Sequence, residues 1–235
     1  MQLLVSVANP IEARDAVAGG ADLIDAKDPL AGALGAVSLD TLRQIHAAVS
    51  GRRAVTAAIG DASDEETIER TAFDYGAAGV AFVKVGFAGI NERVRVEQLL
   101  AAAARGMKAS GTGGAVAVAY ADDMATTVDR VTLLDLAARA GASGVLLDTA
   151  NKRGPRLLQL LSTKALTAWV AAGHSYGLTV ALAGQLTIDD LSSVLDTGAD
   201  IAGVRGAACE GGRSSRISAE RVNALKATMC RPLTV

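Results

Sequence analysis

Short runs of apolar and β-branched residues alternate with longer segments of helical period along the whole chain. Such alternation is typical of βα units that build a parallel sheet. Eight runs have the length and composition of buried strands. They are Leu3–Val7, Leu23–Lys27, Ala54–Ile59, Val80–Val85, Ala115–Ala119, Gly144–Asp148, Thr179–Ala183 and Ile201–Val204. Eight units in 235 residues predict one α/β domain, a single (β/α)₈ TIM barrel spanning 1–235.

Helix starts are predicted from capping patterns between these runs. A Ser, Thr or Asp before an apolar periodic segment, with an acidic residue three positions later, favours a helix N-terminus. The candidates are Ser38, Ser63 with Glu66, and Thr187 with Asp190. The segment Asp123–Arg139 has apolar residues at helical spacing with charges between them, which predicts a helix lying on the sheet.

A weak internal repeat supports the barrel. Gly-Ala pairs precede the second, fourth, sixth and eighth strands, at Gly20-Ala21, Gly76-Ala77, Gly141-Ala142 and Gly198-Ala199. Each pair suits a helix C-cap followed by a tight turn into a strand. The spacing is what four (βα)₂ quarters would give, although Gly-Ala is also common in an Ala-rich chain.

Composition excludes several classes of partner. The formal net charge is −2, and the chain contains only one Trp, three Tyr and three Phe, without a basic block. These features argue against nucleic-acid binding by phosphate neutralisation and base stacking. We therefore expect a small metabolite as partner. Cys209 and Cys230 have neither a CxxC nor a Cys/His spacing, so we expect free thiols and no metal site.

The chain begins directly with a strand-like segment and lacks the pattern of an export signal. No apolar stretch approaches the ~20 residues that cross a bilayer. We therefore expect a cytoplasmic protein without membrane contact. Small barrels commonly associate, so we also expect a homo-oligomer.

Charged residues at strand ends indicate where chemistry takes place. The active sites of such barrels lie at the C-terminal ends of the strands. Asp25 and Lys27 end the second predicted strand, Lys84 the fourth, and Asp148 the sixth, with Lys152 just beyond it. Side chains alternate along a strand, so Asp25 and Lys27 share a face. Burying both charges against the helical layer would cost more free energy than placing them in the solvated mouth of the barrel, so we expect them to face the mouth.

Three converging lysines favour amine chemistry. An amine attacks a carbonyl only when it is unprotonated, and burial among other cations lowers its pKa. The carboxylates of Asp25 and Asp148 would offset the repulsion among the lysine ammonium groups and could relay protons. A single strand-end lysine more often just pairs with a neighbouring Asp in solvent, but the set predicts a class I aldolase-type site.

The last two loops carry a second signal. Gly184 and Gln185 follow the seventh strand, and Arg205, Gly206 and Ala207 follow the eighth, with Arg213 a little further along the chain. Barrels often bind phosphate there on backbone amides. Glycines allow close approach of the anion, and Arg205 or Arg213 could add positive charge.

Longer motifs resemble a known family. They are Leu3–Val7, Gly20–Pro29, Gly32–Gly35, Phe82–Gly86 and Leu146–Lys152, together with the Gly184 and Arg205-Gly206 regions. This set, which extends over nearly the whole chain, is similar to the (5-formylfuran-3-yl)methyl phosphate synthase family.

The resemblance implies a TIM-barrel lyase that condenses two glyceraldehyde 3-phosphate molecules for methanofuran biosynthesis, one of them first isomerised to a dihydroxyacetone-phosphate-like species. It implies that Lys27 forms the Schiff base and that Lys84 accepts a proton. Lys152, Asp25 and Asp148 match further active-site positions, to which we assign proton shuttling. No cofactor or metal is implied.

Two alternatives remain open. Asp25-Ala26-Lys27 reproduces the Asp-x-Lys of barrel lyases of the orotidine-phosphate-decarboxylase type, but that pattern continues with an Asp where Leu30 stands here. The second alternative is a non-catalytic barrel that only binds a phosphorylated ligand. Trapping of a covalent adduct on Lys27 by borohydride would separate both from an aldolase-type enzyme.

Overall fold

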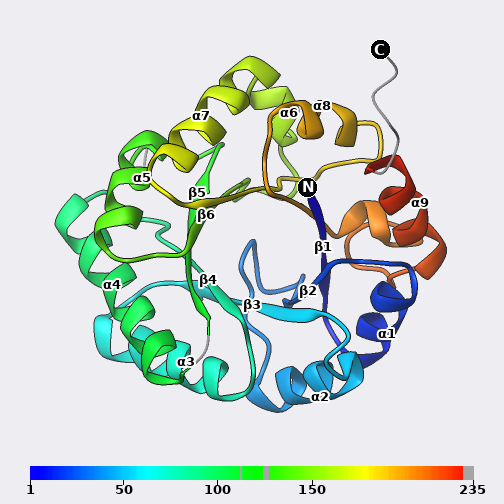
Figure 1. Ribbon diagram of the computed structural model, residues 1–235, viewed down its shortest axis with the longest axis horizontal. Coiled ribbons are helices and arrows are strands. Elements are labelled where there is room, and N and C mark those ends of the chain that lie inside the picture. Colours follow the sequence, from blue (N-terminus) through cyan, green and yellow to red (C-terminus); the bar gives the residue numbers. More distant parts are fainter. Residues whose placement is uncertain (112, 124–126, 230–235) are drawn as a thin grey trace.

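Eight parallel strands close into a barrel in the order β1 to β8, with helices around the outside (Figure 1). The computed structural model describes residues 1–111, 113–123 and 127–229. The strands are β1 (Gln2–Val7), β2 (Leu23–Ala26), β3 (Ala54–Asp61), β4 (Phe82–Gly86), β5 (Gly114–Tyr120), β6 (Gly144–Asp148), β7 (Thr179–Leu182) and β8 (Ile201–Val204). The predicted (β/α)₈ TIM barrel is therefore confirmed.

The helices cover the outer face of the sheet (Figure 1). They are α1 (Pro10–Ala18), α2 (Leu39–Val49), α3 (Glu65–Ala77), α4 (Arg93–Ala109), α5 (Arg130–Arg139), α6 (Leu157–Leu160), α7 (Thr163–Ser175), α8 (Leu191–Asp196) and α9 (Ala219–Met229), with a 3₁₀ turn η1 (Gly206–Ala208). None of the helices in the described part of the chain combines the length and hydropathy needed to cross a bilayer.

The strand ends differ slightly from the prediction. β2 ends at Ala26, so Lys27 is the first residue beyond it, and its N–H donates to the carbonyl of Val7. β4 begins at Phe82 and not at Val80, because Val80 still belongs to the turn that leaves α3.

Two of the predicted helix starts are wrong, and one is confirmed. Ser38 caps α2 by accepting the N–H of Thr41. In α3 the cap is Asp64 and not Ser63, since a carboxylate one residue later reaches the N–H of Thr67. The Asp190 carboxylate accepts the N–H and hydroxyl of Thr187, as in one half of a capping box, but α8 begins only at Leu191.

The helix predicted over Asp123–Arg139 is shorter. α5 begins at Arg130 because Asp129 caps it, accepting the N–H groups of Val131 and Thr132. Met124, which contributed to the predicted apolar stripe, lies outside the described residues.

Glycines at helix ends follow the repeat in three quarters of the barrel. Gly20, Gly141 and Gly198 adopt positive φ just after α1, α5 and α8. In the remaining quarter, Gly76 lies inside α3, and Gly79 takes the positive φ. A left-handed residue satisfies the free carbonyls of a helix end, and glycine adopts it without strain.

Two apolar clusters separate the barrel interior from the outer layer. The larger fills the space between strands and helices, and the smaller contains Leu34, Ala58, Val118, Tyr120, Leu146 and Ala181. Three of the interior members, Ala58, Val118 and Ala181, are small, and a cavity lies along the barrel.

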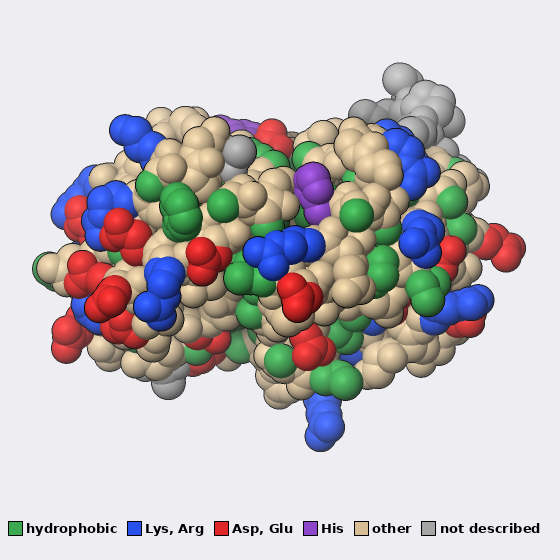
Figure 2. All heavy atoms as spheres, turned by 90° about the horizontal axis from the view of Figure 1, so that it is seen from below, with side chains coloured by type: hydrophobic (Ala, Val, Ile, Leu, Met, Phe, Trp, Pro, Cys, Tyr) green, Lys and Arg blue, Asp and Glu red, His purple; other side chains and the backbone are tan. Residues whose placement is uncertain are grey.

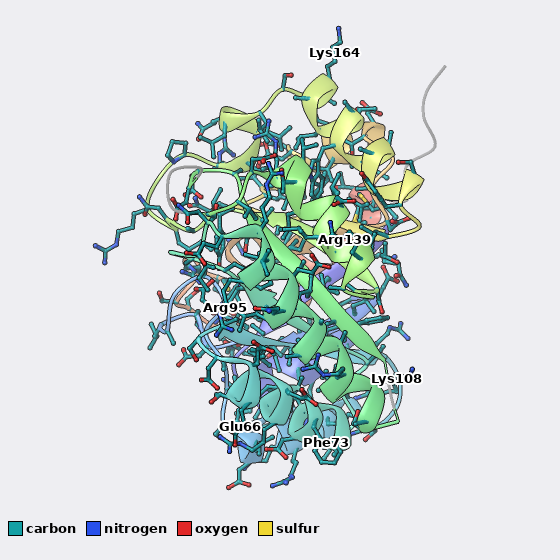
Figure 3. The ribbon with its side chains drawn as sticks, turned by 90° about the vertical axis from the view of Figure 1, so that its left-hand side faces the viewer. Glu66, Phe73, Arg95, Lys108, Arg139 and Lys164 are labelled. Carbon is teal, nitrogen blue, oxygen red and sulfur yellow. The ribbon has the colours of Figure 1, made fainter. Side chains whose placement is uncertain are left out.

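Charged side chains lie on the outside of the helices. Arg95 of α4 pairs with Glu65 of α3, and Arg139 of α5 pairs with Glu97 of α4; both arginines are labelled in Figure 3. On the face seen in Figure 2, acidic and basic side chains are interspersed. Exposed pairs of this kind contribute little to stability.

Candidate active site

One cavity of about 640 Å³ collects the charged residues of the strand ends. Asp25, Lys27, Lys84, Asp148 and Lys152 all line it, although they come from three separate βα units. Asp25, Lys27, Lys84 and Asp148 are buried, and only a ninth of the Lys152 side chain is exposed. The structure therefore brings together all five residues that the sequence suggested for catalysis.

Asp25 and Lys84 form a buried ion pair. Asp25 also accepts the hydroxyl of Ser6 at 2.8 Å and that of Thr56 at 2.8 Å. Burial alone raises the pKa of Asp25, but the ammonium groups of Lys84 and Lys27 and the hydrogen bonds outweigh it, so its pKa lies below the usual value. Asp25 is therefore a carboxylate at neutral pH.

Asp148 and Lys152 form a second pair across one turn of the chain. Lys152 Nζ donates to Asp148 Oδ1 at 2.5 Å, and the N–H of Thr149 donates to the same carboxylate oxygen. Burial alone raises the pKa of Asp148, but Lys152 and Lys27 hold it below the usual value. The loop that carries Lys152 is fixed by Asp122, which accepts the N–H groups of Ala150 and Asn151.

Lys27 differs from the other two lysines because it has no carboxylate partner within ion-pair distance among the described residues. Burial lowers the pKa of Lys27 from 10.5 to about 8. The nearby cations Lys152 and Lys84 lower it further, while Asp148 and Asp25 oppose the shift. Near neutral pH, a useful fraction of this amine is unprotonated and can attack a carbonyl.

Arg205 is occupied by structural contacts. Its guanidinium pairs with both oxygens of the buried Glu12 and donates to the carbonyls of Ser6, Arg213 and Ser215. These bonds use all five N–H groups of an arginine. The geometry therefore gives Arg205 the task of joining β8 to β1 and to its own loop, which differs from the phosphate contact expected from the sequence.

Gly184, Gln185, Gly206 and Ala207 line the same cavity as the lysines. Gly206 and Ala207 open η1, where the first N–H groups have no acceptor within the helix. The amide of the Gln185 side chain instead donates to the carbonyl of Gly154, so it holds the loop after β6.

Arg213 also lines this cavity, from the loop after β8. Its guanidinium is half-buried, and its Nη2 donates to the carbonyl of Gly32 at 3.3 Å. Burial lowers the pKa of Arg213, with Asp148 opposing the shift. The described residues include no carboxylate within ion-pair distance of it, so its charge remains open to an anion.

A family model described as 4-HFC-P synthase matches residues 3–226. The chain belongs to the 4-HFC-P synthase family. The resemblance stated from the motifs is thereby confirmed.

Relatives within the 4-HFC-P synthase family align over nearly the whole chain. The (5-formylfuran-3-yl)methyl phosphate synthase of Methanopyrus kandleri is 38% identical over 218 residues, covering 92% of this chain and 92% of the relative. The protein of that name from Methanocaldococcus jannaschii is 36% identical over 231 residues, covering 96% and 98%. The one from Methanosarcina mazei is 36% identical over 230 residues, covering 97% and 98%.

Solved structures share the fold of this 4-HFC-P synthase family member. A 3-hexulose-6-phosphate synthase superposes with a TM-score of 0.65 at 19% identity, covering 98% of this chain and 100% of that chain. Phosphoribosyl anthranilate isomerase from Thermus thermophilus gives 0.64 at 16% identity, covering 97% and 98%. Identities this low show a common barrel and nothing about the reaction.

Sequence reasoning missed the residues that hold Asp25 and Arg205 in place. Ser6 and Thr56 bind Asp25, and Glu12 binds Arg205. A signal for the first two was present, since each is a lone hydroxyl in an apolar strand. Nothing in the local sequence marks Glu12, because its partner lies 193 residues away.

Among the described residues, no three His, Cys, Asp or Glu side chains gather in the way that would hold a metal ion. Cys209 is a buried free thiol, and Cys230 lies outside the described residues.

Proposed function

We propose that this protein joins two glyceraldehyde 3-phosphate molecules through a Schiff base on Lys27, forming (5-formylfuran-3-yl)methyl phosphate for methanofuran biosynthesis. Overall, one phosphate and two waters leave. The observation that carries the proposal is an unpaired, buried amine with a pKa of about 8, set between two ion pairs in one cavity. The names of the relatives support the product.

Lys84 acts first as an acid and then as a base. In the resting site it is the ammonium partner of Asp25. When Lys27 adds to a substrate carbonyl, Lys84 gives its proton to the departing hydroxyl, and water leaves as the iminium forms. The resulting neutral amine of Lys84 then takes a proton from the carbon beside the iminium, and the enamine attacks the second aldehyde.

The Asp148–Lys152 pair lines the same cavity as Lys27 and serves the later eliminations. Lys152 supplies protons to leaving oxygens, and Asp148 holds it in place. Both groups lie close enough to Lys27 to alter its pKa, which supports a shared reaction space.

The phosphate of a substrate would lie against the loops after β7 and β8. The N–H groups of Gly206 and Ala207 have no acceptor within η1, and Gly184 allows close approach. Arg213 supplies the positive charge, because the N–H groups of Arg205 already have partners.

Incubation with glyceraldehyde 3-phosphate and borohydride tests the proposal. We expect a reduced adduct on Lys27 by mass spectrometry, and the furan phosphate as product when borohydride is omitted. The initial rate of adduct formation should rise with pH through about 8 and level about one unit above, since half of Lys27 is neutral at its pKa and nearly all of it one unit higher. A rate that continues to rise towards pH 10 would contradict the lowered pKa, and an unmodified Lys27 would end the proposal.

Replacing Arg213 with alanine is expected to raise KM for the triose phosphate roughly 10- to 100-fold, because a charged hydrogen bond to phosphate is lost. The fall in kcat should be smaller. Steady-state kinetics measure both. Arg216→Ala is the matched control: Arg216 lies in the same loop but is exposed and paired with Glu210. Equal KM values for the Arg213 variant and the wild type would remove Arg213 from the phosphate site.

A further inference from the structure

A row of three polar side chains crosses the first three strands at one level of the barrel. Ser6 of β1 is the register partner of Asp25 in β2, and Asp25 is the register partner of Thr56 in β3. All three are buried and line the cavity. Because strands fix both backbone level and side-chain direction, the two hydroxyls are held towards the carboxylate between them.

Each carboxylate oxygen of Asp25 receives a separate hydroxyl. Ser6 Oγ donates to Oδ2 and Thr56 Oγ1 donates to Oδ1, both at 2.8 Å. Lys84 contacts Oδ1 as well. The carboxylate is therefore fixed at both ends, and only one of its three contacts depends on a group that changes charge during the reaction.

The charged groups around Asp25 come from several elements. Lys84 from β4 and Lys27 just after β2 are the charged groups that lower the pKa of Asp25. The other charged residues of the cavity are Asp148 and Lys152 on the β6 side, Arg213 and Arg221, and Arg205, which is neutralised by Glu12 of α1. When Lys84 gives up its proton, Asp25 loses its directly bound counter-ion.

At that moment a buried carboxylate is at risk of protonation, because burial favours its neutral form. We infer that Ser6 and Thr56 are positioning residues that keep Asp25 ionised and oriented while Lys84 is neutral. The proton removed from the substrate carbon then goes to Lys84 and not to Asp25. This inference rests on the proposed function, since it concerns the acid–base cycle of Lys84.

The test compares pH profiles of kcat and KM for the wild type, Thr56→Val and Ser6→Ala. Loss of a hydroxyl makes Asp25 harder to ionise in the imine complex, where Lys27 no longer titrates as a free amine, so the acid limb of kcat should move to higher pH by about one unit. At a pH on that limb, kcat falls about tenfold, since a tenfold loss corresponds to one unit. KM should stay unchanged, and the rate should recover at higher pH.

Two controls separate this role from simple structural support. Thr56→Ser keeps a hydroxyl and should restore the wild-type profile. Thr197→Val removes another buried hydroxyl, which donates to the carbonyl of Val194 outside the cavity, and should leave the profile in place.

Wild-type acid limbs in both Thr56→Val and Ser6→Ala would overturn the inference. If Thr56→Val does not fold, Ser6→Ala decides alone, because it removes the bond to the other oxygen. Failure of the proposed function would appear separately, as a wild-type protein without a borohydride adduct on Lys27.

Discussion

Lys27→Met is expected to give a folded protein that forms no borohydride adduct and retains less than about one ten-thousandth of the wild-type turnover. Methionine has nearly the shape of lysine, so the cavity should persist. The protein should also unfold at a higher temperature below pH 8, since folding no longer has to bury or deprotonate an amine there. Product analysis, trapping and thermal unfolding measure the three effects.

Lys108→Met is the matched control. Lys108 ends α4 on the outside of the molecule (Figure 3) and is exposed. The control should lose neither activity nor adduct. Appreciable furan formation by Lys27→Met would transfer the nucleophilic role to another lysine, and tryptic mapping of the trapped wild type would show which.

Asp25→Asn is expected to lower the free energy of unfolding by about 3–5 kcal/mol, because it leaves the Lys84 ammonium buried without its partner. Adding Lys84→Met should restore much of this loss, since the pair is then replaced by uncharged groups. Urea unfolding of both single variants, the double variant and the wild type gives the coupling between the two side chains.

The exposed pair Arg105–Glu69 offers a comparison, because a surface ion pair should show a coupling of at most about 1 kcal/mol. If the coupling energy of Asp25 and Lys84 is no larger than that of Arg105 and Glu69, the buried ion pair does not stabilise the charges of Asp25 and Lys84. The proposal that Asp25 holds Lys84 as an ammonium in the resting site would then fail.

Much of the fold and of the catalytic set follows from sequence because both depend on local rules. The period of the apolar runs predicts strands, and strand ends in a parallel barrel converge on one rim. Lys27, Lys84 and Asp148 could be selected on that basis alone. The capping pattern also located the start of α2, where the Ser38 side chain accepts the N–H of Thr41.

The remainder depends on choices between nearby alternatives or on distant partners. Ser63 and Asp64 are adjacent candidates for the cap of α3, and only the backbone geometry decides between them. Arg205 looked available for phosphate because Glu12, which occupies it, comes from the opposite end of the chain. The bonds from Ser6 and Thr56 to Asp25 require the register of three strands, which no local pattern states.

The joining of β8 to β1 has a consequence for the newly made protein. Arg205 and the last strand are synthesised some 190 residues after Glu12, and they bind the first strand and helix only when the ring is complete. An exposed Lys27 would keep the proton of an ordinary lysine at neutral pH, and only a small fraction of it could attack an aldehyde. The lowered pKa of Lys27 therefore belongs to the closed ring, since it depends on burial that no single segment of the chain provides.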